Sequence, residues 1–302
     1  MKLGFYLLGQ KGYTVLTTFL AHYDSSKVGF IVVSKDSKID NDFYDEIFSL
    51  CQSYKVPCFN KNDGPGETEK TVCYTFAIGW RWLIKDSENL IVLHDSLLPK
   101  YRGFSPLVNM LINGERKLGV TALFATSDYD KGDIINQESI RIEYPIRISE
   151  AIDIISKLYG NLIIKISKNI FSNIELSRVP QLEKEATYSM WRDEYDYAID
   201  WRKDSNYIAR FVNAVSTPFA GAHSFILNKK VRITDVETIT DICIEDRNIH
   251  IGKCIFKQKN KPVIICGTGL LLLNTIYWDE SKSDVLDTLN FRTRLTTTPR
   301  DF

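Results

Sequence analysis

Short apolar runs alternate with amphipathic segments along the first half of the chain, from Lys2 to about Ile142. Runs rich in β-branched and aromatic residues predict strands at Leu3–Leu8, Val28–Val33, Val72–Phe76, Leu90–His94 and Val120–Phe124. Apolar residues at helical spacing predict helices over Tyr13–His22, Asp42–Ser53 and Pro106–Asn113. Because strands that alternate with helices are typical of a mostly parallel sheet, we expect an α/β domain.

The second half of the chain has a different pattern. Ser149–Asn173 is the longest helical segment, and it closes a first domain that we place at residues 1–176. Ser177–Trp191 is polar, contains Pro180 and has little periodicity, which indicates a surface linker, placed at residues 177–205. A helix over Asn206–Ser216 and five short strands then predict a small β-rich, OB-like barrel over residues 206–302; the strands are Ala222–Leu227, Lys230–Thr240, Ile249–Lys257, Pro262–Cys266 and Leu270–Tyr277.

Composition narrows the class of protein. Hydrophobic residues make up 44% and charged residues 25% of the 302 positions, which is typical of a folded globular chain. The charges of the 38 basic and 38 acidic residues cancel, so the chain lacks the net positive charge that attracts nucleic acid or anionic lipid. A phosphate site would therefore have to be formed by a few neighbouring residues. The apolar run of Met1–Gly12 is too short for a membrane or secretory segment, and six cysteines without a C-x-x-C pair suit reduced thiols. We expect a cytoplasmic protein.

Gly9 and Gly12 lie where the first strand turns into the first helix. Backbone N–H groups at such a turn can face an anion, but neither the G-x-G-x-x-G nor the P-loop pattern is present. A tight turn that requires glycine is the reading we favour.

A histidine and a carboxylate follow two successive predicted strands. His94 ends the strand Leu90–His94, and Asp130 lies in a loop with Asp128 and Asp133 directly after Val120–Phe124. Two strand ends could bring the imidazole and the carboxylate to one edge of the sheet, where open α/β sheets bind ligands. Two alternatives stay open: a solvated loop, or a site for a hard cation, for which the spacing does not fit an EF-hand.

His94 and Asp130 lie within a series of four short sequence motifs. These are HDSLLPKYRGFSP (94–106), INGE (112–115), GVTALF (119–124) and DYDKGDII (128–135). Together with IDWRKDSNYIARFVNAVSTPFAGAHSFI (199–226), they closely resemble the 10-formyltetrahydrofolate-dependent formyltransferases, a family that includes the methionyl-tRNA enzymes. The resemblance implies a Rossmann-like catalytic domain followed by a barrel, and a formyl-transfer enzyme with 10-formyltetrahydrofolate as co-substrate and no metal.

Within that family the chain looks most similar to the enzymes that act on nucleotide-linked amino sugars. It has no basic stripe for tRNA, and Gly9-Gln10-Lys11-Gly12 replaces the Gly-Thr-Pro-type opening of the tRNA enzymes. We expect a UDP- or dTDP-linked acceptor rather than a GDP-linked one, no membrane or nucleic-acid partner, and a homodimer. A methionyl-tRNA formyltransferase, a deformylase and a weakly catalytic folate or nucleotide-sugar binding protein are the alternatives.

The resemblance also assigns roles by position. His94 corresponds to the catalytic histidine, as acid and base, and Asp130 to the catalytic aspartate. The family asparagine that donates to the formyl oxygen has no counterpart, because Val92 stands there. For folate binding the resemblance indicates Trp80, Ser96, Leu97, Leu98 and Asp128. For substrate binding we predict Tyr101 and Arg102, where Arg102 matches the arginine of the family's YRG stretch and could instead form an ion pair within the loop. Lys11 and Arg81 are added because their charges suit a phosphate or the folate glutamate.

Overall fold

The structure is a computed structural model that describes residues 1–37, 39, 41–84 and 89–299. These residues form two compact units that interleave along the chain. Unit 1 comprises Met1–Leu107, Arg116–Ile142 and Glu150–Met190. Unit 2 comprises Val108–Glu115, Glu143–Ser149 and the chain from Trp191 onward. Segment 177–190, which the sequence pattern assigns to a linker, therefore belongs to unit 1.

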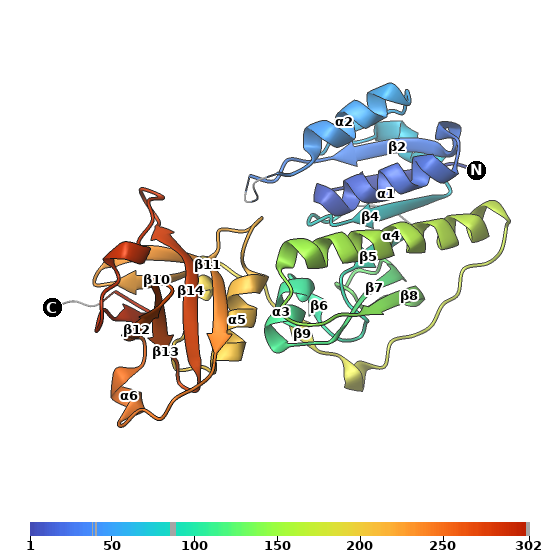
Figure 1. The fold of residues 1–302 in the computed structure, drawn as a ribbon. Coiled ribbons are helices and arrows are strands. Elements are labelled where there is room, and N and C mark those ends of the chain that lie inside the picture. The colour runs from blue at the N-terminus through green and yellow to red at the C-terminus, as the bar shows by residue number, and fades with distance from the viewer. Residues whose placement is uncertain (38, 40, 85–88, 300–302) are drawn as a thin grey trace. The chain divides into compact units, whose positions relative to one another are not determined.

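A seven-stranded sheet forms the centre of unit 1, in the order β3-β2-β1-β4-β5-β7-β8 (Figure 1). The first five strands of this order are parallel, and β7 and β8 are antiparallel to their neighbours. The strands are β1 Leu3–Leu7, β2 Val28–Val33, β3 Cys58–Asn60, β4 Tyr74–Ile78, β5 Leu90–His94, β7 Lys117–Phe124 and β8 Ile134–Arg141. The predicted mostly parallel, Rossmann-like sheet is confirmed.

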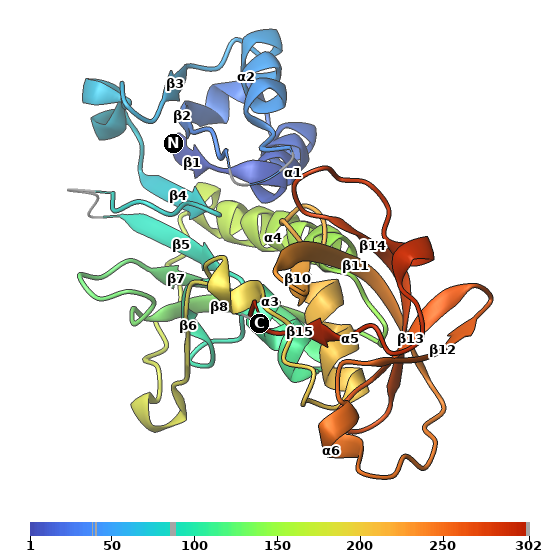
Figure 2. The ribbon, with the colours of Figure 1, turned by 90° about the vertical axis from the view of Figure 1, so that its left-hand side faces the viewer.

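Helices α1 (Gly9–His22), α2 (Tyr44–Ser53) and α4 (Ile148–Phe171) accompany this sheet, and α3 spans Pro106–Asn113. Helices α1 and α4 lie on the same side of the strands (Figure 2). They approach closely where Gly160 faces Thr18, because a Cβ at Gly160 would lie 3.0 Å from the Thr18 hydroxyl. Phe19 and Phe171 extend the contact, with ring centroids 6.5 Å apart.

The turn between β1 and α1 depends on its glycines. Gly9 has a φ of +65°, a conformation that glycine adopts without strain. A Cβ on Gly12 would lie 2.9 Å from the Cβ of Leu7, so only glycine lets the helix pass this close to the strand. The helix also begins at Gly9 rather than at the predicted Tyr13. This geometry supports the reading of a tight turn.

Unit 2 combines helix α5 (Ser205–Ala214) with a six-stranded antiparallel sheet in the order β12-β13-β14-β11-β10-β15 (Figure 1). The strands are β10 Ala222–Ile226, β11 Lys229–Ile239, β12 Cys254–Gln258, β13 Lys261–Ile265, β14 Leu270–Trp278 and β15 Leu295–Thr296. The two ends of the sheet curl toward each other, because the N–H of Cys254 donates to Thr293 and that of Leu295 to Gly252, both at 2.8 Å. The predicted β-rich second domain is confirmed.

One predicted strand of this unit begins too early. Residues 249–250 of the predicted strand Ile249–Lys257 belong to a short helix, α6 (Arg247–His250), and β12 starts only at Cys254. Gly252 explains the break, since its φ is +80° and a Cβ there would lie 2.2 Å from the carbonyl oxygen of Leu295. Two two-residue strands, β6 Arg102–Gly103 and β9 Tyr188–Ser189, pair with each other in unit 1.

Candidate functional site

The structure brings His94 and Asp130 together. His94 is the last residue of β5, and its Nδ1 atom lies 3.5 Å from Oδ1 of Asp130. The two side chains are only 8% and 12% exposed. An imidazole and a carboxylate thus face each other at the carboxyl end of a central strand, the edge at which α/β sheets bind ligands.

The route by which they meet differs from the expected one. Strands β5 and β7 are antiparallel neighbours, and Ile91 near the start of β5 pairs with Phe124 at the end of β7. The carboxyl ends of the two strands therefore point in opposite directions. The loop over residues 125–133 therefore has to return toward His94. Gly132 permits this path, because a Cβ there would lie 1.8 Å from the carbonyl oxygen of Phe124, and Asp130 itself adopts a left-handed φ of 56°.

The surroundings of His94 determine which ring nitrogen is available. Nε2 lies 2.8 Å from the carbonyl oxygen of Tyr101, so in the neutral ring Nε2 carries the hydrogen and donates it. Nδ1 then holds the lone pair and faces Asp130. The Tyr101 carbonyl is positioned in turn by a left-handed φ of 59° and by donation of the Tyr101 N–H to the Thr187 hydroxyl at 2.8 Å.

Asp130 is also held from the other loop. Its Oδ2 atom accepts a hydrogen bond from the N–H of Gly103 at 2.8 Å. Gly103 has a φ of +96°, and a Cβ there would lie 2.7 Å from the carbonyl oxygen of Ser189. The glycine of the YRG stretch therefore lets the backbone pass between Asp130 and the segment that contains Ser189.

Asp95, next to His94, is a polar residue of the site that the sequence analysis missed. Its carboxylate pairs with the ammonium group of Lys11 and accepts a hydrogen bond from the hydroxyl of Tyr159. Burial opposes the charge on Asp95, but Lys11 and Tyr159 outweigh it and lower the pKa of the carboxyl group. Lys11, predicted to bind substrate, pairs with this buried carboxylate in the structure, and its contact with a ligand stays a prediction.

The loop after His94 satisfies most of its polar groups within the protein. The hydroxyl of Ser96 donates to the carbonyl of Lys100 at 2.6 Å. The N–H of Leu98 donates to the Thr121 hydroxyl at 3.1 Å, and its carbonyl accepts from the Gln137 amide at 3.0 Å. The side chain of Leu97 covers Gly119, where a Cβ would lie 2.4 Å from Leu97 Cγ. A folate-binding role of Ser96, Leu97 and Leu98 stays a prediction.

Three other predicted binding residues lie in different surroundings. Trp80 packs edge-on against Tyr6 and Trp82, with ring centroids 5.1 and 5.0 Å away. Arg81 forms an ion pair with Asp36. Asp128 is exposed and pairs with Lys131 at 3.1 Å. Direct contact of Trp80, Arg81 and Asp128 with a ligand stays a prediction.

Arg102 is the largest fully buried side chain in the described part of the chain, with 1% exposure. Its guanidinium donates to Gln181 at 2.9 and 3.1 Å, to Glu183 at 2.8 Å and to the Tyr188 hydroxyl at 3.3 Å. These contacts favour a positioning role for Arg102 over direct contact with an acceptor.

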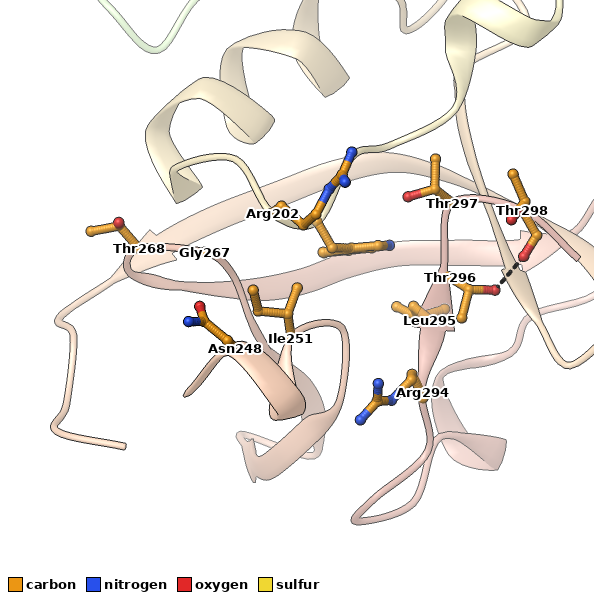
Figure 3. A pocket seen from close by; sticks show the side chains of 11 residues that line it. Arg202, Asn248, Ile251, Gly267, Thr268, Arg294, Leu295, Thr296, Thr297 and Thr298 are labelled. Atoms are coloured by element: carbon orange, nitrogen blue, oxygen red, sulfur yellow. Dashed lines mark hydrogen bonds between the residues drawn. The ribbon is translucent and has the colours of Figure 1, made fainter. Parts of the chain in front are cut away.

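Unit 2 contains a separate cavity of about 750 Å³, whose labelled lining residues appear in Figure 3. Three of its polar side chains have partners within the protein. Arg202 pairs with Asp200 at 2.8 Å, Arg294 donates to the carbonyl of Ile249, and the Thr296 hydroxyl donates to the carbonyl of Thr298 at 2.7 Å. None of the predicted site residues lines this cavity.

The described ranges contain no group of three or more His, Cys, Asp or Glu side chains placed to hold a metal ion. In the same ranges, every helix is too short or too polar to span a bilayer.

Two family models match the sequence. The model described as formyl transferase matches residues 72–153, and the model described as formyl transferase, C-terminal domain, matches residues 193–290. The first range includes both His94 and Asp130.

Curated relatives are methionyl-tRNA formyltransferases. That of Acetivibrio thermocellus is 27% identical over 190 residues, which cover 63% of this chain and 60% of the relative. That of Syntrophomonas wolfei subsp. wolfei is 32% identical over 181 residues, which cover 60% of this chain and 56% of the relative. The chain thus matches less than two thirds of the length of these relatives.

Solved structures with the same fold include two sugar enzymes. WlaRD, a sugar 3N-formyl transferase solved with dTDP and 5-N-formyl-THF, has a TM-score of 0.67 and 18% identity, and the match covers 90% of this chain and 97% of that one. The N-formyltransferase from Helicobacter canadensis, in complex with folinic acid and dTDP-3-aminofucose, has a TM-score of 0.66 and 17% identity, with 90% and 98% coverage. At these identities the likeness concerns the fold.

Proposed function

Because the chain belongs to the formyl transferase family, we propose that it transfers a formyl group from 10-formyltetrahydrofolate to the amine of a nucleotide-linked amino deoxysugar. The observation that carries this proposal is the pair formed by His94 and Asp130, 3.5 Å apart at the carboxyl end of a central strand. Both lie in the range that the family model matches.

The choice of acceptor has separate support. The two sugar enzymes share the fold over 90% of this chain and nearly all of their own length. The net charge of zero also lacks the excess of basic residues that tRNA binding favours. We propose a dTDP- or UDP-linked acceptor on these grounds.

The geometry of His94 suits proton transfer during this reaction. The amine attacks the formyl carbon, a carbon–nitrogen bond forms, and the bond from that carbon to N10 of the folate breaks. The amine nitrogen has to lose a proton, and N10 has to gain one. Nδ1 of His94 would take the first proton and return the second, while the Asp130 carboxylate beside it would attract the imidazolium that forms between the two steps.

As the amine attacks, the formyl oxygen gains negative charge and becomes an oxyanion. Val92 stands where the family has a hydrogen-bond donor to this oxygen. It lies two residues before His94 on β5, so both side chains point to the same face of the strand. A valine side chain cannot donate a hydrogen bond, whereas the family asparagine can. Stabilisation of the oxyanion therefore falls to a backbone N–H, to ordered water or to the protonated imidazole of His94.

Val92→Asn is expected to raise turnover, by up to about 100-fold, because one donor to an oxyanion is worth on the order of 100-fold in rate. The measurement is kcat for formyl transfer, with Val92→Leu as the apolar control. Equal turnover of the asparagine and leucine variants would contradict the idea that this position faces the reacting oxygen.

An assay of the acceptor tests the proposed function. The protein is incubated with 10-formyltetrahydrofolate and a panel of UDP-, dTDP- and GDP-linked amino sugars, and products are analysed by mass spectrometry. We expect one acceptor to gain a mass equal to CO, with release of tetrahydrofolate. Release of formate without any formylated sugar would instead indicate a deformylase.

Methionyl-tRNA is the second candidate acceptor, because the curated relatives are methionyl-tRNA formyltransferases at 27–32% identity. The same assay therefore includes charged initiator tRNA. Transfer to methionyl-tRNA, with every sugar of the panel unchanged, would replace the sugar proposal by this one.

A further inference from the structure

Gln181 joins the two loops that carry the proposed chemistry. It lies in the polar segment at the end of unit 1, far along the chain from both loops. Its Nε2 atom donates to the carbonyl of Asp130 at 2.7 Å and to the carbonyl of Gly132 at 2.8 Å. Its Oε1 atom accepts two hydrogen bonds from Arg102, at 3.1 and 2.9 Å.

The partners of this amide determine its orientation. A guanidinium can only donate and a backbone carbonyl can only accept, so the oxygen of Gln181 has to face Arg102 and its NH₂ has to face the 125–133 loop. All the hydrogen bonds that one amide can readily make are therefore used. A glutamate of the same shape would keep the contact with Arg102 and lose both donors.

These bonds complete a closed circuit around the imidazole. His94 contacts the carbonyl of Tyr101, and Arg102 follows Tyr101 in the chain. Arg102 donates to Gln181, Gln181 donates to Asp130, and the Asp130 carboxylate returns to His94. Gln181 is the member that contacts both loops through its side chain alone.

We propose that Gln181 is a positioning residue for formyl transfer, which holds the Asp130 loop at the distance from His94 that proton transfer requires. This inference rests on the proposed function. Displacement of a reacting group by about 1 Å can cost on the order of 100-fold in rate, so loss of the clamp should reduce turnover without removing any group that touches substrate.

The matched variants are Gln181→Glu and Gln181→Ala, with Glu185→Ala as the control at an exposed position of the same segment. Gln181→Glu is expected to lower kcat by about 10- to 100-fold, with KM for the folate donor changed by less than about threefold. Gln181→Ala should behave alike, and Glu185→Ala should match the wild type. A loss confined to KM would contradict a positioning role.

A double-variant cycle tests whether Gln181 acts through Asp130. In an Asp130→Ala background, Gln181→Glu should reduce kcat by less than about twofold, because the carboxylate that it positions is already gone. The pH–rate profile of the single variant Gln181→Glu should also change in the same direction as the profile of Asp130→Asn. Full, independent losses in the double variant would overturn the proposal.

Hydrogen exchange separates this inference from the proposed function. We expect residues 125–133 to exchange faster in Gln181→Glu than in the wild type, with the exchange of β1 and β4 unchanged. Unchanged exchange of the loop would refute the clamp whatever the reaction is. The loop could exchange faster in Gln181→Glu while the wild-type protein transfers no formyl group to any acceptor. That result would support the clamp and refute the proposed function.

Discussion

Replacing His94 with alanine is expected to lower the turnover of the proposed formyl transfer by about 10³-fold, because in the proposed mechanism this imidazole moves the protons in both halves of the reaction. Binding of the folate donor should change little, since Nε2 of His94 is engaged by the Tyr101 carbonyl and Nδ1 by Asp130 rather than by a binding contact. The measurements are kcat from single- and multiple-turnover assays and the Kd of folinic acid.

His22→Ala is the control for this variant. His22 is exposed, and Nδ1 of its ring lies 2.9 Å from the carbonyl oxygen of Thr18 in the same helix. The control should retain wild-type turnover and folate affinity. A His94→Ala protein with wild-type turnover would remove the imidazole from the mechanism.

Lys11→Met is expected to destabilise the protein by about 3–5 kcal/mol, the cost that accompanies removal of one partner from a buried ion pair. The carboxylate of Asp95 is 13% exposed and would keep only the hydroxyl of Tyr159 as a partner for its charge. Urea unfolding at neutral pH measures the effect. A substrate-binding lysine without a structural role would instead raise KM and leave the unfolding midpoint unchanged.

The pH dependence of this penalty has a definite sign. The pKa of Asp95 is lowered in the folded protein by Lys11 and Tyr159 against the opposing effect of burial. The ion pair therefore stabilises the fold above the unfolded pKa of about 3.9, and this contribution is lost as the pH falls through the folded value. The difference between wild type and Lys11→Met should shrink below about pH 4. The double variant Lys11→Met/Asp95→Leu should recover stability at neutral pH.

The elements that the sequence predicted best are those with a buried, continuous apolar run. Strands Val28–Val33 and Leu90–His94 and helix Pro106–Asn113 have the predicted bounds. The missed strands β3 and β8 lie at the two edges of the sheet, where one is three residues long and the other carries polar and exposed side chains. Edge strands of this kind lack the apolar pattern by which strands are recognised.

The sequence predicted the site residues that belong to local motifs. It did not predict the residues that reach the site from distant parts of the chain. The motifs led to His94 and Asp130, although the antiparallel β7 made the expected route to their contact wrong. Tyr159 lies 64 positions from Asp95, and Gln181 lies 51 positions from Asp130. Tyr159 belongs to the apolar stripe of a helix and Gln181 to an apparent linker, so no local pattern marked either of them.

A crystal structure with folinic acid bound tests the central claim most directly, because this stable formyl folate places a formyl group without allowing transfer. The account predicts a formyl group beside His94 and Asp130, with its carbon and the folate nitrogens within about one water molecule of Nδ1 of His94. A folate bound elsewhere, with His94 and Asp130 still facing each other away from it, would contradict the account.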